Sequence, residues 1–118
     1  MGYDMYLIKA DKSKLKNVSD PYWEDLNEAT IDETNSYYPV LREFYNDRDD
    51  LSWRYGEYNL VSEKTLSDII AWLSNKIEAE GFMSLDPSEE RMTKMVYNNI
   101  KDWVPLSEKE VVYFEEDS

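Results

Sequence analysis

Carboxylates are the most numerous of the side chains in this sequence that could take part in chemistry. The 118 residues include no His and no Cys, while Asp and Glu number 26 against 13 Lys and Arg. The commonest general base, the thiol nucleophile and the usual zinc ligands are therefore missing. What remains is acid–base work by paired carboxylates, binding of hard cations by carboxylate oxygens, and attraction of positively charged partners.

The best candidate for a cation site is the run from Asn46 to Asp50, where oxygen ligands stand at alternate positions. As an EF-hand loop beginning at Asp47, however, it has Ser52 where glycine is required and Tyr58 where a bidentate Glu is required. The three glycines of the chain are isolated, so a phosphate-cradling loop is not expected either. We expect neither a metal nor a cofactor.

Paired carboxylates such as Glu24 with Glu28, or Glu89 with Glu90, suit acid–base catalysis of the glycosidase type. In a chain with 26 acids, such pairs arise from composition alone. A catalytic carboxyl also needs an apolar pocket that raises its pKa, and no other catalytic group converges on these pairs. The sequence therefore favours binding over enzymatic activity.

The negative charge is concentrated in one part of the chain. Residues 1–19 carry a net charge of +2, residues 20–50 carry ten acids and two arginines, and residues 51–118 carry fourteen acids and seven bases. A field of this sign repels nucleic acid and anionic membranes, and it attracts basic partners at rates that fall as salt rises. The expected partner is a basic protein surface, without direct binding of nucleic acid or membrane.

Aromatic side chains stand among these acids. The chain has four Trp and ten Tyr, and rings beside charges are typical of interface hot spots, where the rings supply buried area and the acids supply steering. Burial of Trp23 in the core is the simpler alternative. The sequence predicts a partner-binding surface formed by Tyr22, Trp23, Glu24, Glu28, Tyr37, Tyr38, Glu43, Asp47, Asp49 and Asp50.

Strands are expected at both ends of the chain. Residues 3–10 carry apolar side chains at both parities, which is typical of an interior strand, and residues 111–114 are β-branched and aromatic. Pairing of these two strands would hold both termini. The aromatic run 53–61 adds a strand or a hairpin with a turn at Gly56.

Two short helices are expected in the acidic region. Asp20 as N-cap before Pro21 predicts a helix over residues 21–28, and Pro39 predicts another over residues 39–46. Acidic residues in the first turn of the former suit the positive end of the helix dipole.

Two longer helices follow. The first begins after Ser62 as N-cap and ends before Gly81, and the second opens at Pro87 and keeps an apolar period of 3.6 residues through Trp103 until Pro105. Together the elements predict one α+β domain over residues 1–118. Its small antiparallel sheet includes the N- and C-terminal strands and is covered by two longer helices and one or two short ones.

The opening residues, Met1-Gly2-Tyr3-Asp4-Met5-Tyr6-Leu7, resemble the start of short uncharacterised proteins of phages and bacteria. As a small acidic domain without His or Cys, the chain is also similar to phage-encoded inhibitors of host defence enzymes, including anti-CRISPR proteins that occupy a nucleic-acid channel. The resemblance implies an inhibitor that mimics nucleic acid. Residues 20–50, folded back as two helices, would present one charge per about 3 Å, against one per about 1.7 Å in duplex DNA.

The sequence thus favours a cytoplasmic, non-enzymatic protein that blocks a basic surface of a larger protein, such as a nucleic-acid-handling host defence enzyme. Two alternatives stay open. One is a small enzyme or ligand-binding domain that holds a carboxylate in an aromatic pocket among Trp53, Tyr55, Tyr58 and the helices. The other is an oligomerising structural protein with a homodimer contact at Trp72, which lies off the apolar stripe of its helix.

Overall fold

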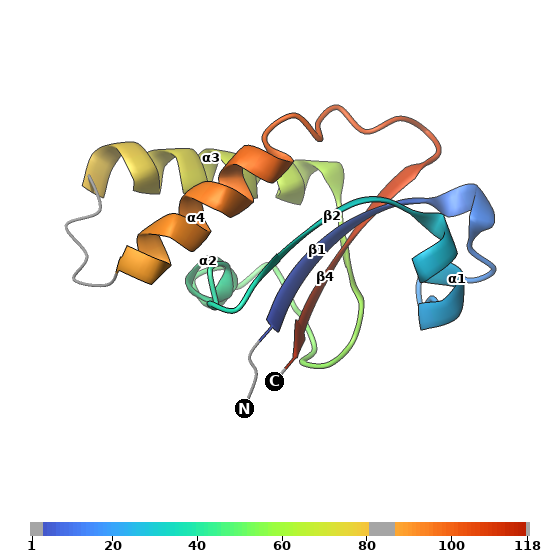
Figure 1. Ribbon diagram of the computed structural model, residues 1–118. Helices are drawn as coiled ribbons and strands as arrows, with labels where there is room; N and C mark the ends of the chain where they lie inside the picture. Colours follow the sequence, from blue (N-terminus) through green and yellow to red (C-terminus); the bar gives the residue numbers. More distant parts are fainter. Residues whose placement is uncertain (1–3, 81–86, 118) are drawn as a thin grey trace.

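A computed structural model gives the architecture as a four-stranded antiparallel sheet with helices on both faces (Figure 1). It describes residues 4–80 and 87–117. The strands, in the spatial order β2-β1-β4-β3, are β1 (Asp4–Asp11), β2 (Thr30–Ser36), β3 (Asn59–Val61) and β4 (Glu110–Asp117). The helices are α1 (Trp23–Ala29), α2 (Arg42–Asn46), α3 (Glu63–Glu80) and α4 (Pro87–Ile100), with a 3-10 turn, η1, at Lys12–Lys14.

The two strands at the ends of the chain form the centre of the sheet. β1 and β4 pair antiparallel over their whole length, from Asp4 opposite Asp117 to Asp11 opposite Glu110. Both strands carry buried side chains on both faces, as the apolar residues at both parities predict. The predicted α+β class and the predicted pairing of the terminal strands are confirmed.

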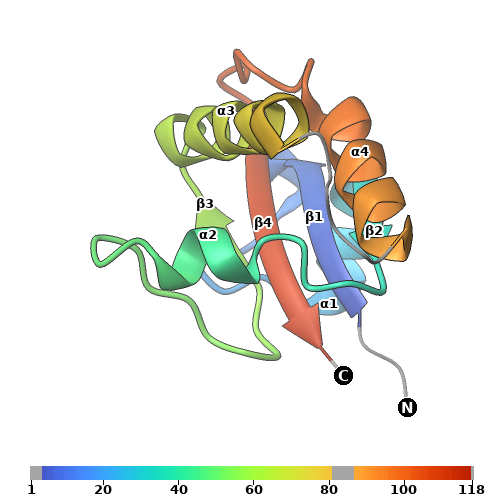
Figure 2. The ribbon, with the colours of Figure 1, turned by 90° about the vertical axis from the view of Figure 1, so that its left-hand side faces the viewer.

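One face of the sheet is covered by α2, α3 and α4, which lie on the near side of the strands in Figure 2. The apolar stripes predicted for the two long helices supply this core, each fully buried Leu or Ile contributing about 2 kcal/mol of transfer free energy. The residues buried here include Met5, Leu7, Leu66, Ile69, Leu73, Val96, Ile100, Val112 and Phe114. This face of the sheet is called the helix-covered face below.

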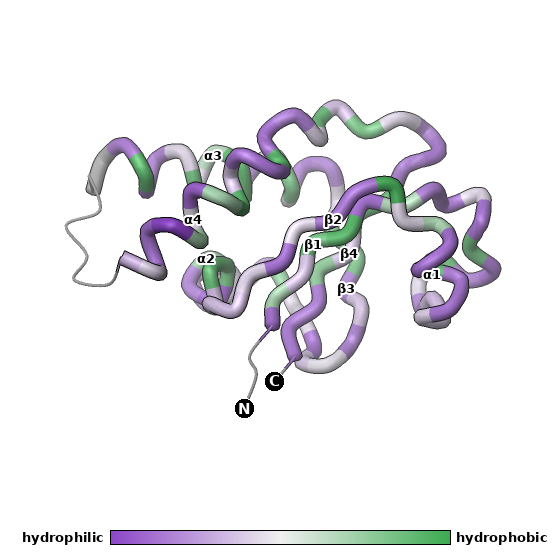
Figure 3. The backbone as a smooth tube through the Cα atoms, viewed as in Figure 1, coloured by the Kyte–Doolittle hydropathy of each residue, from purple (hydrophilic) through white to green (hydrophobic). Residues whose placement is uncertain are grey.

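The opposite face of the sheet is only partly covered. α1 lies on this side, behind the strands in Figure 2, and buries Leu26 and Ala29 against Ile8, Ala10 and Tyr113. In Figure 1 it sits at the end of the sheet where β1 ends and β2 begins. Most of α1 is hydrophilic in Figure 3, because only one side of it meets the sheet. The segment before α1 adds Leu15 and Val18 to this cluster, and the face beyond them carries half-buried or exposed side chains.

Both short helices begin later than the prolines predict. α1 starts at Trp23 because Tyr22 has an extended backbone (φ −74°, ψ 142°), and its N-cap makes no side-chain hydrogen bond. The predicted capping role of Asp20 is therefore wrong. α2 starts at Arg42, since the residues after Pro39 form a turn in which the Arg42 N–H donates to the Pro39 carbonyl at 3.2 Å.

α4 ends at Ile100, earlier than the apolar period predicts. Trp103 is nevertheless buried, and its indole Nε1–H donates to the Asp32 carboxylate at 3.1 Å. This bond reaches β2, the strand that the sequence does not predict. The side chains of Thr34 and Ser36 on the same strand are buried, and the Asn99 amide donates to the Thr34 hydroxyl at 2.8 Å.

The run 53–61 contributes less strand than predicted. Only Asn59–Val61 pair with β4, as edge strand β3. The expected turn at Gly56 is present, since its φ of +77° lies in the left-handed region that glycine adopts without strain. The Asn59 side chain holds this turn by bonding the Arg54 backbone on both its N–H and its carbonyl.

Candidate docking surfaces

The structure divides the ten predicted partner-binding residues instead of joining them. Tyr22, Trp23, Glu24 and Glu28 lie at or on α1, while Glu43, Asp47, Asp49 and Asp50 lie on α2 and the loop that follows it. α1 and α2 occupy opposite faces of the sheet and opposite ends of β1, a strand of eight residues that spans about 25 Å (Figures 1 and 2). The acidic region therefore forms two separate surfaces.

The α1 surface exposes large rings. Tyr22 is 67% and Trp23 60% exposed, so the alternative that Trp23 belongs to the core is wrong. Glu24 and Glu28 are also exposed. The turn η1 packs beside this helix and carries the exposed Lys12 and Lys14, which lower the net negative charge at this end of the molecule.

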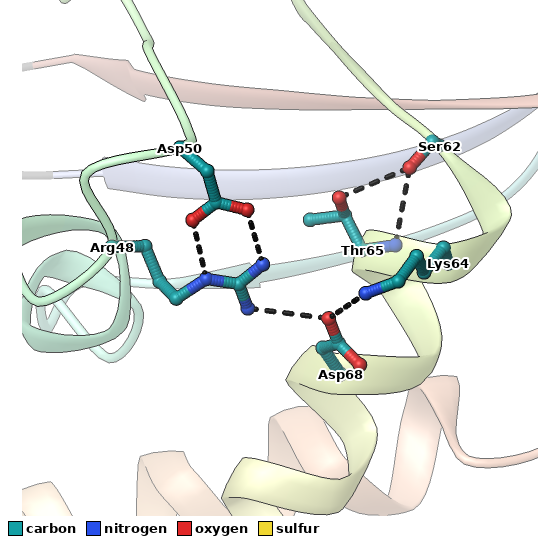
Figure 4. Close-up of polar contacts among 6 residues, drawn as sticks. All are labelled: Arg48, Asp50, Ser62, Lys64, Thr65 and Asp68. Atoms are coloured by element: carbon teal, nitrogen blue, oxygen red, sulfur yellow. Dashed lines mark hydrogen bonds and ion pairs between the residues drawn. The ribbon is translucent and has the colours of Figure 1, made fainter.

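The α2 surface is partly neutralised by the chain's own cations. Arg48 binds the Asp50 carboxylate through two hydrogen bonds of 2.8 and 2.7 Å and also reaches Asp68 at 3.2 Å (Figure 4). The hydrogen bond from Arg48 lowers the pKa of Asp50 to about 2. The Lys76 ammonium binds Glu43 at 2.9 Å. Asp47 and Asp49 are exposed in the same segment.

The two tyrosines between β2 and α2 are not equivalent. Tyr37 is exposed, whereas Tyr38 packs against the core of the helix-covered face. The Ser36 side chain ties this bend together by accepting from the Tyr38 N–H and donating to its carbonyl, both at 3.0 Å. Tyr38 is therefore half-buried and offers a partner less area than the sequence predicts.

Trp72 joins α2 to α3. Its ring meets Phe44 edge-on with centroids 5.7 Å apart, and the Lys76 ammonium lies 5.0 Å from the Trp72 ring centroid. An open groove of about 370 Å³ runs beside these rings; its lining comprises Phe44, Asp47, Arg48, Asp68, Ala71, Trp72 and Asn75. The position of Trp72 off the apolar stripe is thus explained by a contact within the chain.

A third surface, which the sequence does not predict, lies on the part of the sheet that α1 leaves uncovered. Tyr6 of β1 stands opposite Asn35 of β2 on one side and opposite Glu115 of β4 on the other. Tyr58 comes directly before Asn59, which pairs with Phe114, so Tyr58 lies across from Glu115. The row of four residues runs across the whole sheet on one face, because side chains at cross-strand partner positions share a face.

Further carboxylates lie on the same face, at alternate positions along the strands. On one side of this row, Asp4 of β1 and Asp117 of β4 occupy opposite positions on neighbouring strands. On the other side of the row, Glu33 of β2 stands opposite Ile8 of β1. We call this surface the acidic sheet face; it consists of Asp4, Tyr6, Glu33, Tyr58, Glu115 and Asp117.

No strand contributes a cation to the acidic sheet face. Lys9 is the only basic residue in the four strands, and it alternates onto the helix-covered face. There its ammonium binds Glu110 at 3.5 Å and lies 5.7 Å from the ring centroid of Trp103. Within the residues described, neither Glu33 nor Glu115 forms an ion pair.

The electrostatics of this face are self-repulsive. Partial burial raises the pKa of Glu115, and the charges of Asp117 and Glu33 raise it further. Partial burial also raises the pKa of Tyr58, to which the charges of Glu115 and Glu33 add. All these shifts oppose negative charge, so a bound cation would stabilise the ionised face.

A second carboxyl with a raised pKa, Glu116, faces the other way. It is fully buried on the helix-covered face, where burial raises its pKa. Its Oε1 accepts from Arg42 at 3.0 and 3.2 Å, while its Oε2 has no hydrogen-bond partner among the described residues. Arg42 opens α2, so this pair anchors the helix to the end of β4.

The aromatic region proposed for a ligand pocket forms an open hollow of about 550 Å³ at the β3 edge. Trp53 and Tyr58 are among the residues that line it, but neither Glu115 nor Glu116 is. The carboxyls whose pKa values burial raises therefore lie outside this hollow.

No protein-family model, curated protein or solved structure matches this chain. In the part of the chain that the structure describes, no three acidic side chains are placed to hold a metal ion together. No helix there combines the length and the apolarity needed to cross a membrane.

Proposed function

We propose that this chain is a non-enzymatic binding protein whose acidic sheet face docks onto, and blocks, a basic surface of a larger protein. The supporting observation is that Glu33 and Glu115 share that face, form no ion pair among the described residues, and meet no cation contributed by a strand. Asp4 and Asp117 lie on the same face and add to its negative charge. A basic partner would relieve the mutual repulsion of these carboxylates and would be steered in by the net charge of −13.

The α2 surface supports this role less well. Its five acids, Glu43, Asp47, Asp49, Asp50 and Asp68, share the surface with Arg48, Lys64 and Lys76, and all three cations form ion pairs there. A partner would have to replace interactions that already exist. At Glu33 and Glu115 on the acidic sheet face it would form new ones.

The class of partner that this face would fit is a protein that handles nucleic acid. Proteins that handle nucleic acid present basic surfaces to phosphates, and the resemblance to phage inhibitors of such enzymes points the same way. Adjacent strands are about 4.8 Å apart, so the carboxylates of the face recur at about 5–10 Å, a sparser charge than that of DNA. On the same side of the sheet, the exposed rings of Tyr22 and Trp23 add hydrophobic contact area.

Two variants test this assignment, each with two charges removed. Glu33→Gln with Glu115→Gln discharges the acidic sheet face, and Asp47→Asn with Asp49→Asn discharges the α2 loop. The immobilised proteins are exposed to the heparin-retained fraction of a bacterial lysate at about 50 mM and about 500 mM salt. We expect wild type and the Asp variant to capture the same basic proteins at low salt and release them at high salt.

The Glu variant should capture several-fold less. Equal capture by both variants, or loss in the Asp variant alone, would place the docking surface elsewhere. Absence of any salt-sensitive capture by the wild type would remove the proposed function altogether.

A further inference from the structure

The row across the acidic sheet face places one carboxylate between two aromatic residues. Glu115 lies directly opposite Tyr6 on β1, and Tyr58 lies on its other side. Facing side chains on neighbouring strands have Cβ atoms about 5 Å apart, so both rings are within reach of whatever binds the Glu115 carboxylate. All three side chains are half-buried, neither enclosed in the core nor free in water.

The carboxylate of Glu115 is a hydrogen-bond acceptor that lacks a donor. It forms neither a hydrogen bond nor an ion pair with the described residues, although partial burial and the neighbouring Asp117 and Glu33 disfavour its charge. A guanidinium group can donate two parallel N–H bonds to such a carboxylate, whereas an ammonium group binds it as a point charge.

The rings add a preference of the same kind. A planar guanidinium stacks on aromatic faces and is more weakly hydrated than an ammonium, so it loses less on entering a half-buried site. The Tyr58 ring is braced by Tyr113 in an edge-on contact with centroids 6.4 Å apart. The Tyr113 hydroxyl in turn donates to the carbonyl of Val18, which packs against the same cluster. Tyr58 is thus held in place before a ligand arrives, which reduces the entropy lost on binding.

We infer that the acidic sheet face recognises an arginine side chain of the partner protein, with the guanidinium bound by Glu115 between Tyr6 and Tyr58. This inference rests on the proposed function and narrows it from basic surfaces in general to arginine-bearing ones. A second copy of the chain is disfavoured as the occupant, because each copy carries a net charge of −13.

The test uses two synthetic peptides of equal length, one alternating glycine with arginine and the other glycine with lysine. Each is titrated into the 15N-labelled wild-type chain, so that the amide shifts locate the peptide and also give its affinity. We expect both to shift residues 6, 58 and 115, with the arginine peptide binding about three- to tenfold more tightly.

Variants of the row separate ring from charge. Tyr58→Leu removes the ring and should bring the two affinities together, while Tyr58→Phe keeps the ring and should retain the preference for arginine. Glu115→Gln should weaken both peptides several-fold. If a variant fails to fold, the comparison of the two peptides on the wild type decides alone.

The titrations distinguish failure of the arginine inference from failure of the proposed function. Equal affinity of both peptides for the acidic sheet face would overturn the arginine inference and leave the proposed function standing. Shifts confined to residues outside this face, or no binding of either peptide, would overturn both. Concentration-dependent dimerisation that alone moves residues 6, 58 and 115 would identify a second copy as the occupant and would also contradict the inference.

Discussion

The carboxyl of Glu115 is disfavoured as an anion by the folded protein, and this has a measurable consequence for stability. Its pKa is raised above the usual 4.5, first by burial and then by the charges of Asp117 and Glu33. At pH values between 4.5 and the raised pKa, the folded state therefore binds more protons than the unfolded state. As the pH rises through this range, Glu115 lowers the free energy of unfolding.

Replacing Glu115 by Gln removes this penalty. We expect the variant and the wild type to have equal free energies of unfolding below about pH 4, where the carboxyl is neutral in both states, and the variant to be the more stable at pH 7. Urea denaturation at several pH values measures the difference. A wild type that is the more stable at pH 7 would mean that Glu115 has a stabilising partner.

Asp68 provides the control of opposite sign. Hydrogen bonds from Lys64 and Arg48 lower its pKa below 3.8 (Figure 4). Such a group stabilises the fold above its unfolded pKa, and this contribution is lost as pH falls through its folded pKa. Asp68→Asn should therefore be less stable than the wild type at pH 7, and the difference should shrink on acidification.

At the level of elements, the start of α3 depends on one side chain. The Ser62 hydroxyl accepts from the Thr65 N–H at 3.1 Å, which satisfies one of the amides at the helix start that have no partner within the helix (Figure 4). Ser62→Ala should lower the free energy of unfolding by about 1 kcal/mol.

Ser67 is the matched control for this capping prediction. It is an exposed serine within the same helix, so Ser67→Ala should be neutral or slightly stabilising, because alanine has the higher helix propensity. Thermal denaturation followed by circular dichroism compares the two variants. Equal effects at the two positions would argue against a capping role for Ser62.

Apolar periodicity predicts those helices and strands that bury a regular row of their own side chains. β1, β4, α3 and α4 carry apolar residues at the spacing of their own secondary structure, so the sequence alone identifies them. β2 has no such signal, because its strand is an edge held by the β1 backbone and by Trp103 and Asn99. The helix starts at Trp23 and Arg42 likewise depend on local turns that the prolines do not reveal.

At the scale of the molecule, the proposed docking surface could not be predicted from the sequence, because its residues come from separate parts of the chain. Residues 20–50 are continuous in the sequence, so their acids suggest a single surface. The sheet divides this region, and brings Glu33 from it together with Glu115 and Asp117 from the other end of the chain. The alternation of side chains along β1 and β4 could have placed Tyr6 and Glu115 on the face away from the long helices. Bringing them together with Glu33 also requires the register of β1 with β4 and the presence of β2.

Oxidative footprinting of aromatic side chains can locate the docking surface, because exposed or half-buried rings lie on the acidic sheet face, on α1 and on the helical side. The protein is oxidised alone and in complex with a basic protein that it captures, and the modified residues are quantified by mass spectrometry. On the acidic sheet face, Tyr6 and Tyr58 should be protected in the complex, while Trp72 and Tyr97 on the helical side keep the reactivity they have in the free chain. Protection of Trp72 with Tyr6 and Tyr58 unchanged would place the partner on the helical side and rule out docking by the acidic sheet face.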